Sequence, residues 1–287
     1  MRYLEKIKLD SKEVKQARQL AKVIHEHDKT FCDIYLSNQY NYFKDMPTFI
    51  LAYDNEELIG LTMLYADEKP DEEVDIHVEV APKKRQQGVA TEMIKRAKKI
   101  LNKYGYQNYD FVSEKAFIEQ NPTYLSNNNL KVDAADYHMS TQNPEKIFQD
   151  DKLNRILGVR QMVKTDFNNV ASIYSVAFDL DIANAKTYIA ESLADDQMLS
   201  FVLTYKEDVI GYCAVDDGYF FGLFVARDYQ GHGYASFFIK KMMEILIRKG
   251  INEFSLDVEP DNIAAVRTYQ NAGLKIVSET YYLVKEK

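Results

Sequence analysis

The sequence has few cysteines, no long apolar run and no excess of positive charge. Its two cysteines, Cys32 and Cys213, cannot form a disulfide framework, so we expect a reduced compartment and two buried packing thiols. No apolar run approaches the roughly 18 residues of a membrane-spanning helix. The first residues also lack the apolar core of a signal peptide. We therefore expect a cytoplasmic protein without a membrane partner.

The balance of charge is acidic. The formal net charge is -8 and the isoelectric point is near 5.3. Proteins whose main partner is nucleic acid usually present a basic patch, so this balance argues against a nucleic-acid partner. An amine-bearing substrate is compatible with the charge, although acidic charge also serves solubility alone. The length of 287 residues fits two domains of about 100 to 150 residues each.

One glycine-containing turn occurs twice, each time between a strand-like run and an amphipathic run. The strand-like runs are Val74 to Val80 and Tyr219 to Val225. The turns read Arg85-Gln86-Gln87-Gly88-Val89-Ala90-Thr91 and Gln230-Gly231-His232-Gly233-Tyr234-Ala235-Ser236, and they lie 145 residues apart. The same offset aligns one apolar helix face after each turn and the closing glycines Gly105 and Gly250. An internal duplication explains this match.

A turn between a strand and a helix N-terminus is suited to an anion. The first N–H groups of a helix lack partners and lie at the positive end of its macrodipole. Glycine allows a positive φ and a close approach of the backbone, and Ser236 adds a hydroxyl donor. An ordinary surface turn is the alternative for a single Gly-x-Gly motif. The duplication favours a phosphate or pyrophosphate site.

Both turns resemble a known motif. Their common pattern, Gln/Arg-x-x-Gly-x-Ala, is similar to the acyl-CoA-binding motif of the GNAT superfamily of N-acetyltransferases, and the resemblance spans nearly the whole chain as two tandem units. It implies an α+β fold, an α/β sandwich in which each unit has a mixed, mostly antiparallel sheet with helices on both faces. The sheet is splayed at its fourth strand. We expect domains at residues 1–141 and 159–287, joined by a linker at 142–158.

The resemblance also implies a site for acetyl-CoA in each unit. The turn amides of both copies would hold the pyrophosphate, and the preceding strands would contact the rest of the cofactor through Val78 and Val80 in the first copy and Leu223, Phe224 and Val225 in the second. The tail Leu256-x-Val-x-x-x-Asn262-x-x-Ala265-x-x-x-Tyr269-x-x-x-Gly273-Leu274 looks like the second family motif. There Asn262 contacts the cofactor arm, and the Tyr269 hydroxyl is the general acid. A core tyrosine is the alternative.

The general base is not identifiable from the sequence. In the second copy Asp216, Asp217, Asp257, Glu259 or a water chain would have to serve, because the strand before the turn has no carboxylate. His232 belongs to the phosphate turn, where its backbone N–H matters more than its ring. In the first copy Asp75, His77 and Glu79 share one strand face. A carboxylate on this strand often serves as base in the family, so Glu79 and Asp75 are candidates; a solvated face is the alternative.

The two copies differ in the tail. In the first copy Phe117 stands where the second has Asn262, and Pro122 precedes Tyr124. We therefore expect the second unit to be catalytic and the first to bind acyl-CoA weakly or to serve as a scaffold. The expected activity is transfer of acetyl to a primary amine of a small molecule or peptide, by a monomer or homodimer without a metal. The alternative is a non-catalytic acyl-CoA-binding or sensing protein.

The remaining sequence predicts ordinary elements. Helices are expected at Ser11 to His27, with Ser11 as N-cap, at Phe31 to Phe43, from Asn121 to about Asn127, and at Ala185 to Leu193. Hairpins are expected at 49–65 and 199–215. The runs 131–140 and 275–285 are predicted to be the closing strands of the first and second unit, respectively.

Overall fold

The chain forms two compact units. In the computed structural model, residues 1–141, 153–194 and 198–286 are described. One unit comprises Met1–Asp136 with Ser278–Lys287, and the other comprises Tyr137–Val277. No helix in these ranges is long and apolar enough to cross a membrane.

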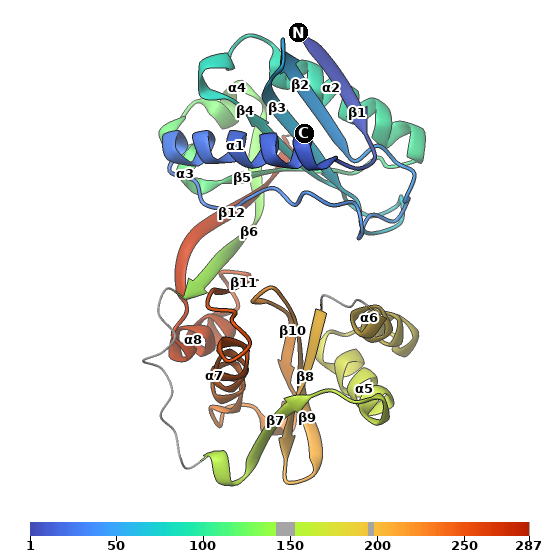
Figure 1. The fold of residues 1–287 in the computed structure, drawn as a ribbon, viewed down its shortest axis with the longest axis vertical. Helices are drawn as coiled ribbons and strands as arrows, with labels where there is room; N and C mark the ends of the chain where they lie inside the picture. The colour runs from blue at the N-terminus through green and yellow to red at the C-terminus, as the bar shows by residue number, and fades with distance from the viewer. Residues whose placement is uncertain (142–152, 195–197, 287) are drawn as a thin grey trace. The chain divides into compact units, whose positions relative to one another are not determined.

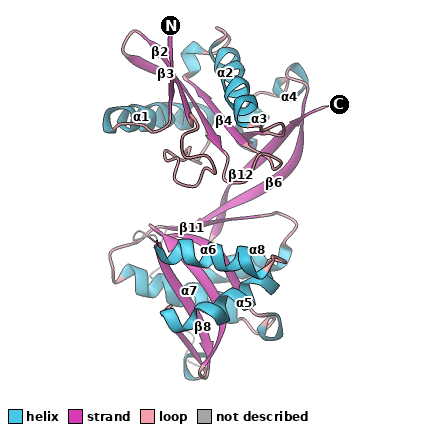
Figure 2. Cartoon of the chain, turned by 90° about the vertical axis from the view of Figure 1, so that its right-hand side faces the viewer, coloured by secondary structure: helices cyan, strands magenta, loops and turns pink. Residues whose placement is uncertain are grey.

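The first unit is a mixed sheet with a helix on each face. Its strand order is β1 (Arg2–Lys6), β2 (Phe49–Asp54), β3 (Glu57–Tyr65), β4 (Asp75–Val80), β5 (Asp110–Glu114) and β12 (Lys275–Lys285). Neighbouring strands are antiparallel except β4 and β5, which are parallel. Helix α1 (Ser11–Asp28) covers one face and α2 (Val89–Tyr104) covers the other (Figure 2). The short helices α3 (Lys115–Gln120) and α4 (Tyr124–Asn127) follow β5.

Local chemistry sets the bounds of the two long helices. At the start of α1, Asp10 accepts hydrogen bonds from the N–H groups of Lys12 and Glu13, and the Glu13 carboxylate accepts from the Asp10 N–H. This capping box makes Asp10 the N-cap, so the prediction of Ser11 was wrong by one residue. Helix α2 ends at Gly105, whose φ of 92° terminates the helix as the sequence predicted.

The second unit repeats the arrangement. Its strand order is β6 (Leu130–Thr141), β11 (Phe254–Val258), β10 (Tyr219–Val225), β9 (Asp208–Asp216), β8 (Met198–Tyr205) and β7 (Leu157–Gln161). Strands β10 and β11 pair in parallel, and the pairs β6–β11, β10–β9, β9–β8 and β8–β7 are antiparallel. Helices α5 (Phe167–Ala177) and α6 (Ile182–Ala194) lie on one side, and α7 (Tyr234–Ile247) and α8 (Ile263–Ala272) lie on the other (Figure 1). The short 3-10 helices are Pro82–Lys84 in the first unit and Leu153–Arg155, Lys164–Asp166 and Arg227–Tyr229 in the second.

The two closing strands are exchanged between the units. Strand β6 leaves the first unit and pairs with β11, from Tyr137↔Val258 to Thr141↔Phe254. Strand β12 leaves the second unit and pairs with β5, from Thr280↔Glu114 to Leu283↔Phe111. Met139 is buried in the second core and Leu283 in the first. The units therefore run differently from the predicted domain boundaries, because alternation of apolar residues fixes the buried face of a strand but not its partner.

Two predicted helices differ from the structure. Residues 31–43 form no helix, and the buried Asn41 explains why. Its side chain donates to the Leu64 carbonyl at 2.9 Å and accepts from the Ala66 N–H at 3.0 Å, which holds the chain in an irregular course. Of the helix predicted from Asn121 to about Asn127, only Tyr124–Asn127 is helical (α4), and residues 121–123 form a turn after α3. Of the predicted linker, residues 142–152 lie outside the described ranges, and β7 already begins at Leu157.

Candidate active site

The two duplicated turns have the same backbone. In the first, Gln86 and Gly88 have φ values of 60° and 81°; in the second, Gly231 and Gly233 have 78° and 77°. Helices α2 and α7 begin directly after Gly88 and Gly233, and neither receives a hydrogen bond from a capping side chain. Positive φ values at alternate residues turn successive N–H groups toward one side. The geometry suits an anion at both turns.

The space beside the turns is open. A Cβ built on Gly88, Gly231 or Gly233 has no heavy atom within 4 Å. These glycines are therefore required by the backbone angle and not by crowding. A phosphate fits such a place, because uncapped N–H groups meet a volume that the protein leaves unfilled.

The first residue of each motif fastens the turn to the preceding strand. Gln230 Nε2 donates to the Val225 carbonyl at 2.8 Å, and Arg85 Nε donates to the Val80 carbonyl at 3.0 Å. We predicted all four residues as cofactor contacts. Both side chains bond to the protein's own backbone, which leaves the turn amides to face an anion, and these residues stay predicted cofactor contacts.

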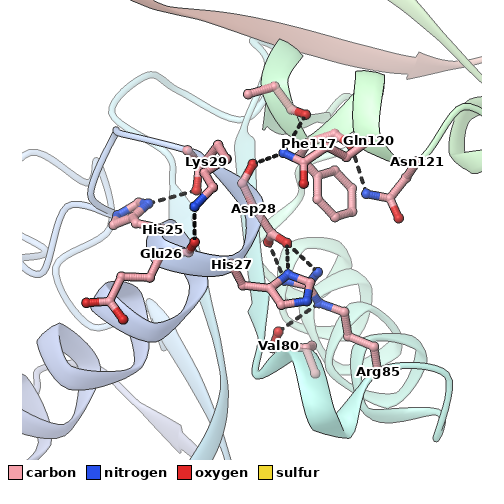
Figure 3. Close-up of polar contacts among 12 residues, drawn as sticks. His25, Glu26, His27, Asp28, Lys29, Val80, Arg85, Phe117, Gln120 and Asn121 are labelled. Carbon is pink, nitrogen blue, oxygen red and sulfur yellow. Dashed lines mark hydrogen bonds and ion pairs between the residues drawn. The ribbon is translucent and has the colours of Figure 1, made fainter.

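Arg85 also makes an ion pair that has no counterpart at Gln230. Its guanidinium donates to both Asp28 carboxylate oxygens, at 2.8 and 2.5 Å (Figure 3). Burial acts to raise the pKa of Asp28, but the hydrogen bonds from Arg85 and His27 outweigh it and hold that pKa below its ordinary value. Gln120 Nε2 donates to the Asp28 backbone carbonyl, and Phe117 lies 5.4 Å from the guanidinium carbon.

Asp28 was missed by the sequence analysis. It is the last residue of α1, where a negative charge opposes the helix macrodipole. An acid at such a position needs a specific partner, and this was the signal that a cation lies nearby.

The strands before the turns diverge from their parallel neighbours. Strand β4 pairs with β5 only from Asp75 to His77, and β10 pairs with β11 only at Tyr219↔Ser255. The backbone of Val78–Val80 and of 220–225 therefore has one edge without a parallel strand partner. This is the predicted splay at the fourth strand of each unit.

Only the second unit has an irregularity in this strand. The pairing of β10 with β9 shifts register between Phe221 and Phe224, where Gly222 has a φ of 54°. Strand β4 pairs with β3 without a shift. A bulge re-aims the backbone groups of the bulged strand, so the segment from Gly222 to Val225 differs from its regular counterpart.

Two tyrosines fix the bulge. A Cβ on Gly222 would lie 3.0 Å from the Tyr188 hydroxyl and 3.1 Å from the Tyr174 hydroxyl. The two rings stack with centroids 4.8 Å apart. Burial raises the pKa of Tyr174 to about 12. No motif in the sequence marked these residues, because their meeting depends on α5 and α6 packing over β10.

Tyr269 lies on α8 and packs half-buried against the core beneath α7. Burial raises its pKa to about 12, with a smaller contribution from Cys213, so the hydroxyl keeps its proton at neutral pH. Asn262 accepts from the Ala265 N–H at 3.1 Å and so caps α8. Tyr124 in the first unit packs edge-on against Phe117, with ring centroids 5.1 Å apart.

Among the candidate bases of the second unit, Asp257 has hydrogen-bond partners. It accepts from the Tyr219 hydroxyl at 2.6 Å, and its other oxygen lies 2.6 Å from His138 Nδ1. Asp257 is two residues beyond Ser255, the last position at which β11 pairs with β10, and it pairs with His138 of β6. His138 comes from the exchanged strand β6, which is why sequence reasoning did not connect it with this site.

The face that carries ionisable groups in the first unit carries aromatic rings in the second. In the first unit, the residues Asp75, His77 and Glu79 pair with β3. Tyr219, Phe221 and Phe224 pair with β9 at the corresponding positions of the second unit. In the first unit these side chains are half-buried, so the face is not simply solvated. Burial raises the pKa of Asp75 to about 7 and of Glu79 to about 8, and lowers that of His77 to about 4.

Comparison with protein families also divides the chain into two similar parts. The model of the acetyltransferase (GNAT) family matches residues 14–116 and 164–274, which together are more than half of the chain. The chain belongs to the GNAT acetyltransferase family. The predicted resemblance and α+β fold class are thereby confirmed, and acyl transfer is the chemistry that this family supports. A search of curated proteins found no significant match.

Solved structures share the fold of this GNAT chain at low sequence identity. A GCN5-related N-acetyltransferase from Sphaerobacter thermophilus has a TM-score of 0.74 and 13% identity over 98% of this chain and 94% of its own. A tandem GNAT protein from the clavulanic acid biosynthesis pathway has a TM-score of 0.70 and 11% identity over 98% and 97%. A GNAT-family acetyltransferase from Colwellia psychrerythraea has 0.62 and 14% over 99% and 100%.

The cysteines of this GNAT chain differ in burial. Cys213 is fully buried, whereas Cys32 is half-buried with its Sγ 3.1 Å from Ser278 Oγ. An open pocket of about 770 Å³ lies elsewhere in the first unit, beside the start of β5, and none of its lining residues belongs to either turn. The candidate site is thus defined by the turns and the diverging strands and not by that pocket.

Proposed function

We propose that the protein is an N-acetyltransferase that transfers acetyl from acetyl-CoA to a primary amine of a small molecule or peptide, and that its second unit is catalytic. The observation that carries this proposal is the bulge at Gly222, which lies where β10 leaves β11 and one short strand segment before the turn at 230–236, whose helix has no capping side chain. A cytoplasmic location belongs to the same proposal.

The residues of the second unit fit acetyl-CoA, which supplies an activated thioester. The turn amides from Gly231 to Ser236 would hold its pyrophosphate, as the open space beside both glycines supports. The free edge of Leu223 to Val225 would receive the amide arm, and Asn262 lies on the neighbouring helix terminus. Bulged backbone N–H groups near Leu223 would polarise the acyl carbonyl.

Two side chains would move protons. Tyr269 retains its proton at neutral pH because its pKa is about 12, so it can donate to a departing thiolate. We propose Asp257 as the base that deprotonates the amine, since Tyr219 and His138 orient its carboxylate. General acid or base groups typically contribute about 10²- to 10⁴-fold to rate.

The decisive test compares two tyrosine variants. Tyr269→Phe is expected to lower turnover about 100-fold with acetyl-CoA affinity unchanged, because only the transferable proton is removed. Tyr124→Phe is the matched control in the other copy and should leave turnover intact. Loss of turnover in Tyr124→Phe alone would move catalysis to the first unit.

For the first unit we propose weak acyl-CoA binding or a scaffold role. The regular strand β4 and the ion pair between Arg85 and Asp28 support this. Calorimetry with acetyl-CoA should then give a stoichiometry near one.

A non-catalytic acyl-CoA-binding protein is the second candidate. It is favoured by the absence of a carboxylate on β10, where Phe224 takes the place of Glu79. Acetyl-CoA binding without hydrolysis, and without turnover against a panel of amines, would establish this alternative.

A further inference from the structure

A buried carboxylate at the start of β5 lies outside the candidate active site and lacks a hydrogen-bond donor. Asp110, the first residue of this strand, is 7% exposed. Burial and the negative charges of Glu73 and Asp133 raise its pKa to about 6, and no donor or cation among the described residues opposes them. The carboxylate is therefore mostly ionised at neutral pH. Buried carboxylates are normally hydrogen-bonded or paired with a charge, so Asp110 can accept a donor from outside the chain.

Asp110 lines the open pocket of about 770 Å³ in the first unit. Three further carboxylates line the same pocket: Glu73 before β4, Asp133 on β6 and Glu286 after β12. Because the charges of Glu73 and Asp133 act on Asp110, these three carboxylates face one space. Strand β5 pairs with β4 from Asp110 to Val112 and diverges beyond that point. The pocket therefore lies at the opposite end of the paired segment from the diverging strands.

Backbone hydrogen bonds hold the walls of the pocket. The Asp110 N–H donates to the Val74 carbonyl at 3.0 Å, and the Val74 N–H donates to the Asn108 carbonyl at 3.2 Å. On the β12 side, the Glu286 N–H donates to the Asn129 carbonyl at 2.9 Å. The backbone that carries the carboxylates is therefore in place before a ligand binds, which lowers the entropy cost of binding.

The pocket carries more negative than positive charge. Its four carboxylates are accompanied by two lysines, Lys131 and Lys285. Lys131 Nζ lies 3.7 Å from an Asp133 oxygen, and Lys285 Nζ donates to the Asn128 carbonyl. The other three carboxylates form no ion pair within the part of the chain that the structure describes. The pocket therefore suits a ligand with positive charge.

The positions of the carboxylates distinguish between kinds of cation. A metal ion needs several ligands around one point. No three His, Cys, Asp or Glu side chains gather in this way in residues 1–141, 153–194 and 198–286. The carboxylates instead come from separate segments around an open space. A ligand whose positive charges are also separated can pair with several of them at once, and an aliphatic polyamine has this property.

We propose that this pocket binds an aliphatic polyamine, whose ammonium groups pair with Asp110, Glu73 and Glu286. Each ammonium group has N–H donors that form charge-assisted hydrogen bonds with carboxylate oxygens. The second unit lacks the central carboxylate, because Ser255 pairs with β10 where Asp110 pairs with β4. The site is separate from the one proposed for acetyl transfer and stands whether or not the second unit is catalytic.

The test is calorimetry on the full chain near neutral pH, without acetyl-CoA. The probes are spermidine, the singly charged butylamine, and magnesium chloride. We expect spermidine to bind with a stoichiometry near one and at least about tenfold more tightly than butylamine, because it reaches several carboxylates. Magnesium should not bind.

Variants of the lining residues assign the binding to the pocket. Asp110→Asn should weaken spermidine binding at least about tenfold, because it replaces a charged acceptor by a neutral group of almost the same shape. Glu73→Gln should weaken it about threefold, since Glu73 is exposed. Glu72→Gln is the matched control: Glu72 is exposed in the same loop but does not line the pocket, so this variant should bind as wild type. Asp110→Asn should unfold at no lower temperature than wild type, because it removes a buried charge.

Two further variants separate the pocket from the diverging strands. Glu79→Gln and Asp257→Asn neutralise carboxylates of β4 and β11, neither of which lines the pocket, and both should bind spermidine as wild type. Spermidine binding that is lost in either of these variants and survives Asp110→Asn assigns the amine to the diverging strands and overturns the proposal. Absence of spermidine binding, or equal binding in Asp110→Asn and wild type, overturns it as well. Magnesium binding that is lost in Asp110→Asn, with no spermidine binding, assigns the pocket to a metal instead.

Discussion

At the scale of single residues, the two copies keep one contact and change its charge. Arg85 and Gln230 both bond the last carbonyl of the preceding strand, at Val80 and Val225. Unlike Gln230, Arg85 is positively charged, and its guanidinium forms an ion pair with the Asp28 carboxylate, which is 2% exposed. The first turn thus begins with a neutralised cation, whereas the second begins with a neutral amide.

Asp28→Ala should free the Arg85 guanidinium and destabilise the first unit. Breaking a buried ion pair costs about 3 kcal/mol, so thermal unfolding of this unit should shift downward. A free guanidinium beside the first turn should also strengthen acyl-CoA binding there, and the calorimetric stoichiometry should rise from near one toward two. Asp166→Ala is the control, because Asp166 pairs with Arg160 in the same way and neither residue belongs to a turn. An unchanged stoichiometry in Asp28→Ala would show that this ion pair does not weaken acyl-CoA binding at the first turn.

Glu79 should make stability depend on pH. Its pKa of about 8 in the folded chain lies above the ordinary value of 4.5, so the folded state binds more protons than the unfolded state between these values. This stabilising contribution is complete below about pH 4.5 and is lost as pH rises toward 8. Chemical unfolding of Glu79→Gln should therefore gain stability relative to wild type across this range. A constant difference between the two proteins would show that Glu79 ionises normally.

At the scale of elements, patterns of short range predicted well and contacts of long range did not. Both turns, the hairpins and α2 follow from glycine positions and periodicity, which are local properties. The turn residues remain predicted cofactor contacts. Residues 31–43 failed as a helix because Asn41 binds Leu64 and Ala66, which lie far along the chain. Gly222, Asp28 and His138 were missed for the same reason: their partners come from other elements.

The bulge of β10 should depend on Gly222. Gly222→Ala introduces a Cβ at about van der Waals overlap with two tyrosine hydroxyls and imposes a positive φ on alanine, which costs roughly 1–2 kcal/mol from the backbone alone. We expect lower stability of the second unit and a loss of turnover larger than the loss of stability explains. Gly250→Ala is the control, with a positive φ but open space around its Cβ. Equal turnover in Gly222→Ala and Gly250→Ala would show that the bulge is not needed for the proposed activity.

At the scale of the whole molecule, connectivity matters more than the duplication alone indicates. Each half of the sequence carries the glycine turn with its preceding strand and following helix, and this much was predictable. The exchange of β6 and β12 was not, because the two strands have similar lengths and alternation, so either could close either sheet. Residues 137–141 and 278–286 therefore belong to the units that the repeat pattern does not assign them to.

A chain that ends at Val277 should lose the first unit. It lacks the paired part of β12, including Leu283, which is fully buried in the first core. We expect hydrogen exchange of β4 and β5 to become fast while β8 and β9 stay protected. A chain that lacks only Lys287 is the control. Protection of β5 in the shorter chain would show that the exchanged strand is dispensable.

The exchange of strands also bears on how the two copies are inherited. A deletion that removed either half of the gene would take away a strand that completes the sheet of the other half. The two halves of the chain must therefore be kept together for either unit to be complete. The two copies can therefore differ in chemistry, as they do at Phe117 and Asn262, while each still needs the other's strand to complete its sheet.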